Sequence, residues 1–236
     1  MPTSRSDTAA PPDRNRAILF RRRSVSGVEN VTDRISNPFG MRPPCEQFVP
    51  GYGDANAAFH VVGDHPGVHG GLDTGVPFTN PAGRRLQAAL ADAGLLTATG
   101  DAPEVAETFL SYLHLCAPTE TPPSQPSYDE LEPFFDAEVR AIAAHVILPV
   151  GARATAHVLE TYTAHPVESE PDMETLHATE RVGSGFLVVP IADPTDWGPT
   201  HHDRLVDGIL TLRSTDFRRE ADLGRFIPGD DSYLVR

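Results

Sequence analysis

The 236-residue sequence predicts an α/β fold built on a central, mostly parallel four-stranded sheet. Four short apolar runs have the length and the content of β-branched residues that are typical of buried strands. Strands that alternate with helices along a chain pair in parallel through right-handed crossovers. A hydrophobic content of 39% is enough for one well-cored domain. The predicted strands span 58–62, 107–115, 145–149 and 186–191.

Each predicted helix follows from a local signal. In the first, apolar residues lie on one face: Leu86, Ala89, Leu90 and Ala93. The second begins after Ser127, a capping residue that Glu130 follows three positions later. The region 163–182 is polar and predicts irregular structure. The predicted helices span 83–93, 128–144, 152–159 and about 201–214.

The two ends of the chain differ from the predicted domain. Residues 1–36 carry seven Arg against four acidic residues, the reverse of the remaining chain, and predict a disordered tail before a domain at 37–236. Two interpretations of the tail stay open: an over-extended gene start, with translation beginning near Val28, or a basic arm at 21–23 that binds DNA. Residues 215–236 are amphiphilic, and they either pack over the domain or meet a partner.

The charge of the chain is strongly one-sided. Its net charge is −14, and all 19 basic residues are Arg, because the sequence contains no Lys. This composition resembles that of proteins from salt-loaded cytoplasms. At about 1 M salt the Debye length is about 3 Å, so acidity does not exclude a DNA substrate. Without an apolar run of about 18 residues or an apolar signal core, we expect a cytoplasmic protein with no membrane span, and we expect a monomer.

The two cysteines, Cys45 and Cys116, are too few for a disulfide framework and fit a reducing compartment. We expect them to be buried thiols without a chemical role. A zinc ion shared with His side chains is the alternative.

Titratable residues gather directly after the first predicted strand. Gly63 ends that strand, and a loop rich in Gly and Pro follows. The carboxyl end of a parallel strand is where α/β proteins place their functional sites. The sequence therefore predicts a site in this loop. Its titratable residues are Asp64, His65, His69 and Asp73.

The order of four motifs resembles the uracil-DNA glycosylase superfamily, and within it the iron–sulfur-type branch. Residues 63–67 (GDHPG) correspond to the branch's Gly-Glu-Ala-Pro-Gly loop, and 77–83 (PFTNPAG) to Pro-Phe-x-Gly-x-Ala-Gly. Residues 115–118 (LCAP) correspond to Lys-Cys-Arg-Pro, and 149–154 (PVGARA) to Leu-Gly-x-x-Ala. The resemblance covers about 45–215. It implies a three-layer α/β/α fold and cleavage of the N-glycosidic bond of a flipped uracil or deaminated base in DNA repair.

The sequence departs from this branch at three places. Leu131 stands where the third of four cluster cysteines is expected, so we predict no iron–sulfur cluster and no other cofactor or metal. Asp193 begins the triplet that replaces His-Pro-Ser, the motif whose His stabilises charge on the departing base. Tyr112 replaces the Asn that reads the edge of uracil.

The resemblance, together with the chemistry of the reaction, assigns roles to residues. Asp64 and His65 are expected to position and deprotonate the attacking water, and His201 to donate to the departing base. An aromatic platform is expected at Phe78. The residues expected to bind the base are Phe78, Tyr112, Asp193, Gly63 and Pro66.

Structural alternatives remain open for several of these residues. Phe78 suits a core position as well as a stacking platform, and His65 suits a contact with the backbone. His201 suits the first turn of a helix capped by Thr200. Trp197 is either a wedge into the space left by a flipped base or a hydrophobic anchor.

Three functions are consistent with these features. The first is a DNA glycosylase-like hydrolase whose partner is single-stranded or uracil-containing DNA. The second is a catalytically inactive protein of the same fold that binds single-stranded DNA or nucleotides. The third is an enzyme with a changed base preference, in which Tyr112 and Asp193 are the altered readers.

Overall fold

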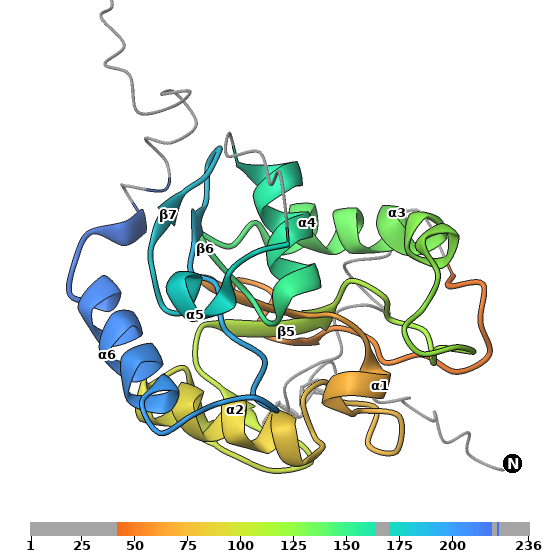
Figure 1. The fold of residues 1–236 in the computed structure, drawn as a ribbon, viewed down its shortest axis with the longest axis horizontal. Helices are drawn as coiled ribbons and strands as arrows, with labels where there is room; N and C mark the ends of the chain where they lie inside the picture. The colour runs from red at the N-terminus through yellow and green to blue at the C-terminus, as the bar shows by residue number, and fades with distance from the viewer. Residues whose placement is uncertain (1–41, 164–169, 219–220, 222–236) are drawn as a thin grey trace, which may run out of the picture.

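A six-stranded sheet forms the centre of the computed structural model, which describes residues 42–163, 170–218 and 221. The strand order is β1-β5-β2-β6-β8-β7, and helices cover both faces (Figure 1). The four inner strands run parallel to one another. These inner strands are β5 (Thr108–Tyr112), β2 (Phe59–Gly63), β6 (Val146–Pro149) and β8 (Leu187–Val188).

The predicted α/β class and the parallel pairing are confirmed, but the predicted strand count is wrong by two. The sheet also contains β1 (Tyr52–Gly53) and β7 (Arg181–Val182), which pair antiparallel at its two edges. Each is two residues long, too short for a hydrophobic period to be visible in the sequence. A separate hairpin joins β3 (Leu96–Ala98) to β4 (Glu104–Val105).

The predicted three-layer arrangement is confirmed. On one face, α2 (Pro81–Asp92) and α6 (His201–Arg213) bury apolar residues against one side of the sheet. On the other face, α3 (Gln125–Ile142) and α4 (Ala152–Tyr162) do the same. Figure 1 shows the two pairs on opposite sides of the strands. Among the described residues, no helix has the length and hydropathy to cross a membrane.

The observed helices differ from the predicted bounds mainly at their starts. The helix α3 begins at Gln125 rather than at Tyr128, because Pro126 fits the first turn of a helix, where no N–H is needed. The helix α2 begins at Pro81 for the same reason, and Asn80 caps it. The region 163–182, predicted to be irregular, contains the short helix α5 (Met173–Leu176) and the edge strand β7.

The expectation of two free thiols is wrong, because Cys45 and Cys116 form a disulfide with their Cα atoms 6.1 Å apart. Residues 47–49 run antiparallel to the chain that leaves β5. The amide of Val49 donates to the carbonyl of Leu115 at 2.8 Å, and the amide of Ala117 donates to Gln47 at 2.9 Å. This pairing brings together two cysteines that are 71 residues apart in the sequence, a separation that gives no sign of it.

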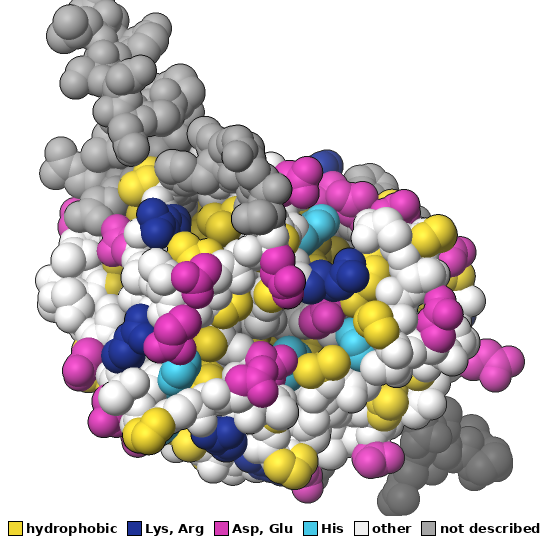
Figure 2. All heavy atoms as spheres, viewed as in Figure 1, with side chains coloured by type: hydrophobic (Ala, Val, Ile, Leu, Met, Phe, Trp, Pro, Cys, Tyr) yellow, Lys and Arg dark blue, Asp and Glu magenta, His cyan; other side chains and the backbone are white. Residues whose placement is uncertain are grey.

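The proposed tail at 1–36 lies outside the described residues, as does most of 215–236. Over the described part, Asp and Glu side chains are spread across the face shown in Figure 2, where Lys and Arg are fewer. This distribution agrees with the net charge of −14.

Candidate active site

The loops that leave the four parallel strands meet at one edge of the sheet. Gly63 at the end of β2 lies opposite Tyr112 at the end of β5, and Val62 lies opposite Pro149 of β6. Because these ends are in register, the polar residues that follow them are neighbours in space. The site predicted after β2 is therefore joined by residues that follow β5, β6 and β8.

One link across this edge is the contact between His69 and Asp193. His69 Nε2 lies 3.2 Å from Asp193 Oδ2, although the two residues are 124 positions apart in the sequence. The ring of His69, in α1 (Pro66–His69), is fully buried, whereas 26% of the Asp193 side chain is exposed. The Nδ1 atom of His69 is buried and has no hydrogen-bond partner among the described residues.

The pKa of Asp193 reflects this contact. Burial alone would raise it, but the hydrogen bond and the charge of His69, with the amide of Thr195 at 2.8 Å, lower the pKa to about 2. Asp193 is therefore a carboxylate at neutral pH, and it is the group that holds the imidazole in place. Gly151, after β6, lies beside it: a Cβ built there would be in ordinary van der Waals contact, 3.7 Å from Asp193 Oδ2.

The rings of Phe78 and Tyr112 pack against His69 and against each other. The ring centroids of Phe78 and Tyr112 are 5.2 Å apart, and those of Phe78 and His69 are 5.4 Å apart. The Tyr112 hydroxyl accepts from the Phe78 amide at 2.8 Å and donates to the Gly70 carbonyl at 2.9 Å. Burial raises the pKa of Tyr112, so its hydroxyl stays protonated. Both Phe78 and Tyr112 are 1% exposed, and Gly63 lies directly against them.

Asp64 belongs to a second group at the same edge. It is partly exposed, and its Oδ1 accepts a hydrogen bond from the Tyr128 hydroxyl. Burial and this hydrogen bond raise the pKa of Tyr128, so the phenol remains the donor. The guanidinium of Arg153 lies 4.4 Å from the centre of the Tyr128 ring. The carboxylate is thus held at one oxygen by an uncharged donor.

His65 contacts the backbone. Its Nδ1 accepts the amide of Gly67 at 3.1 Å at the start of α1, whose first residue is Pro66. Burial lowers the pKa of His65, against the opposing effect of Asp64. The ring is therefore neutral at pH 7, and with Nδ1 used as an acceptor it carries its proton on Nε2. His114 lies nearby, with its Nε2 2.7 Å from the hydroxyl of Ser127.

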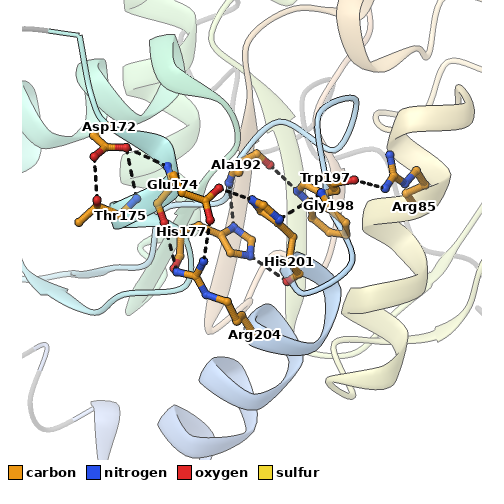
Figure 3. Close-up of polar contacts among 10 residues, drawn as sticks. All are labelled: Arg85, Asp172, Glu174, Thr175, His177, Ala192, Trp197, Gly198, His201 and Arg204. Carbon is orange, nitrogen blue, oxygen red and sulfur yellow. Dashed lines mark hydrogen bonds and ion pairs between the residues drawn. The ribbon is translucent and has the colours of Figure 1, made fainter.

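His201 is placed in a different network, at the start of α6. Its Nε2 lies 3.1 Å from Glu174 Oε2, and its Nδ1 accepts the amide of Gly198 at 3.1 Å. His177 connects this network to the last strand, because its Nε2 lies 2.8 Å from the carbonyl of His201 and its Nδ1 accepts the amide of Ala192 at 2.9 Å. Figure 3 shows both rings between α6 and the chain that leaves β8. Both nitrogens of His201 are used in holding this segment.

Trp197 anchors the same segment. It is 7% exposed, packs in the core, and donates its indole N–H to the carbonyl of Ala192 at 2.8 Å. From α2, Arg85 donates to the carbonyl of Trp197 at 2.9 Å (Figure 3). It also donates to the carbonyl of Pro194 at 2.6 Å. Of the two interpretations of Trp197, this burial favours the hydrophobic anchor. The segment that carries Asp193 is thereby fixed from two sides.

Sequence reasoning missed two contributors to the site, Tyr128 and Arg153. Tyr128 lies in the first turns of α3, where it counted only as part of a helix. Arg153 follows β6, so the placement of sites at strand ends could have found it. No local signal shows that Tyr128 reaches Asp64, because the two are 64 residues apart.

The donor set does not suit an iron–sulfur cluster. Such a cluster takes four thiolates, and this chain has two cysteines, which are bonded to each other. Within the described parts of the chain, no three His, Cys, Asp or Glu side chains are grouped so that they could hold a metal ion.

The chain is similar to a known protein family over most of its described residues. No curated protein matches the chain. A family model, that of the uracil DNA glycosylase superfamily, matches residues 50–204. The match takes in the four parallel strands, the loops that leave them and the start of α6. The chain belongs to the uracil DNA glycosylase superfamily.

Proposed function

We propose that this protein is a DNA glycosylase-like hydrolase that cleaves the N-glycosidic bond of a flipped uracil or deaminated base. The observation that carries the proposal is the contact of His69 with Asp193 beside the buried rings of Phe78 and Tyr112. It joins the loops after β2 and β8 at the edge where a member of this superfamily acts. Single-stranded or uracil-containing DNA is the proposed substrate, bound by a cytoplasmic monomer.

In this proposal, Asp64 accepts the proton of the attacking water. It is partly exposed, and among the described residues Tyr128 bonds only one of its oxygens, which leaves the other to orient a water molecule towards the sugar. His65, neutral and protonated on Nε2, serves as a donor beside it rather than as the base.

The departing base takes up negative charge, which a preorganised donor stabilises. His69 is the group proposed for this task, because Asp193 fixes its Nε2 and its Nδ1 has no hydrogen-bond partner among the described residues. His201 then acts indirectly, by fixing the segment that carries Asp193.

The experiment is a base-release assay in molar KCl. Oligonucleotides with a single uracil, hypoxanthine or xanthine, as single strands and as duplexes, are incubated with the protein and then treated with alkali to reveal abasic sites. Asp64→Asn is expected to lower the rate by about 10²–10⁴-fold. Asp73→Asn is the matched control, an exposed carboxylate in the same loop. Base release that survives both Asp64→Asn and His65→Ala would contradict this mechanism.

A protein that binds without turnover is the second candidate, and the burial of Phe78 and Tyr112 favours it. Two rings that are 1% exposed and packed on each other leave no open platform for a base. This function predicts salt-tolerant binding of single strands, measured by fluorescence anisotropy, with no abasic product from any substrate.

A further inference from the structure

The backbone around Tyr112 is shaped to hold a planar ring. A Cβ added to Gly63 would lie 2.7 Å from the ring of Tyr112 and 2.8 Å from that of Phe78, so the absence of a side chain there lets the two rings meet. Phe78 has a φ of 62°, a left-handed conformation that aromatic residues rarely adopt. The ring of His69 stacks on the ring of Tyr112 at an angle of 16° with 6.4 Å between centroids. We call the space bounded by Gly63, His69 and Phe78 the ring slot.

The inner end of the ring slot presents one backbone donor and one backbone acceptor. The amide of Phe78 and the carbonyl of Gly70 both reach the Tyr112 hydroxyl, at 2.8 and 2.9 Å. A hydroxyl satisfies both because it accepts and donates at one atom. A pyrimidine-2,4-dione edge offers the same pair, as a carbonyl oxygen beside an N–H.

We propose that Tyr112 is a built-in occupant of the ring slot and the residue that sets its specificity. While the phenol is in place, a pyrimidine is excluded from the ring slot, so a base that the wild type binds has to lie beside the slot or displace the phenol. Without it, the ring slot is a site for a planar six-membered ring that carries an acceptor next to a donor. The inference goes beyond the proposed function, and it rests on that function only in taking this edge of the sheet as the place where a base binds.

The test uses ligand-dependent thermal stability, in molar KCl, of the wild type and Tyr112→Ala. Uracil and phenol are expected to bind Tyr112→Ala at least tenfold more tightly than the wild type. At ten times the dissociation constant, each is expected to raise the melting temperature of the variant by about 3–5 °C. Benzene, which has no hydrogen-bonding edge, is expected to give a smaller shift.

Two further variants separate the ring from the hydroxyl and from a general cavity effect. Tyr112→Phe keeps the ring, so it is expected to exclude uracil while exchange of the Phe78 amide hydrogen becomes at least tenfold faster. Phe135→Ala opens an apolar cavity at another fully buried aromatic residue, and uracil is not expected to stabilise it.

The proposal is overturned if neither uracil nor phenol stabilises Tyr112→Ala, or if Tyr112→Phe binds uracil equally well. If Tyr112→Ala does not fold alone, recovery of folded protein on refolding with phenol or uracil supports the proposal. Failure of both ligands to restore folding, while Tyr112→Phe folds, overturns it. Uracil binding by Tyr112→Ala without base release from DNA by any variant would remove the hydrolase and leave this inference standing. Base release by the wild type with no ligand shift in Tyr112→Ala would do the reverse.

Discussion

Asp193 takes its charge state from its immediate neighbours, and its ionised carboxylate therefore contributes to the stability of the protein in acid. Its folded pKa of about 2 lies below the ordinary value of 3.8. The stabilisation is therefore complete above about pH 4 and is lost as the pH falls through 2. The difference between the two pKa values corresponds to about 2 kcal/mol of the free energy of unfolding.

Asp193→Asn is expected to be less stable than the wild type by about 2 kcal/mol at pH 5–6, with the gap closing between pH 4 and pH 2. Urea unfolding across this pH range measures it. Asp196→Asn, an exposed residue on the same turn, is the control and should show no such closing gap. A constant difference for Asp193→Asn at every pH would show that its carboxylate does not provide this stability.

For single residues, the sequence indicated where the candidate site residues lie along the chain but not which residues they contact. Asp64 and Asp193 could be placed at strand ends, because titratable residues there are readable from local order. Their partners could not, since Tyr128 and His69 come from segments 64 and 124 positions away. A contact between such distant positions depends on how the strands pair, which no local pattern encodes.

Among the elements, α2 depends on its first turn to hold the site. Asn80 accepts the amide of Gly83 at 2.8 Å and donates to the carbonyl of Val68 in α1 at 2.6 Å. One side chain thus caps α2 and joins it to the short helix that carries His69.

Asn80→Ala is expected to lower the free energy of unfolding by about 1–2 kcal/mol, because it removes both a helix cap and a link to α1. Urea denaturation provides the measurement. Asn56→Ala, at an exposed position, is expected to change stability by less than about 0.5 kcal/mol. Equal effects of the two substitutions would argue against the capping role.

The inner strands and the long helices were predictable because their apolar residues repeat with a clear period. The strands β1 and β7 were not, since two residues cannot show a period of two. The start of α3 was placed three residues late because Ser127 and Glu130 imitate a capping box inside the first turns of the helix.

For the whole molecule, the excess of negative charge opposes folding. With a net charge of −14, the acidic side chains repel one another in the compact state. Figure 2 shows acidic side chains spread over the face in view. Added salt shortens the range of this repulsion to about 3 Å at 1 M.

The melting temperature is therefore expected to rise by several degrees between 0.1 and 2 M KCl. Differential scanning calorimetry measures it, with sucrose at equal osmolality to separate charge screening from solvent exclusion. A rise that sucrose reproduces in full would contradict the electrostatic explanation.

The class of the molecule was readable from motif order, since residues 63–67, 77–83 and 149–154 follow one another as in the superfamily that the chain belongs to. The filled ring slot was not readable. Tyr112 is visible in the sequence as a substitution, but only the positions of Phe78 and Gly70 show where its hydroxyl goes.

The disulfide between Cys45 and Cys116 has a consequence for limited proteolysis of the protein. It encloses every element from β1 to β5, including α1 and α2, in one covalently closed loop. A protease that nicks the backbone once at an exposed turn between those cysteines would leave two fragments that still migrate as a single species. They would come apart only after a reductant is added. Two fragments that separate without a reductant, in protein denatured directly from cells, would show that the disulfide is not formed there.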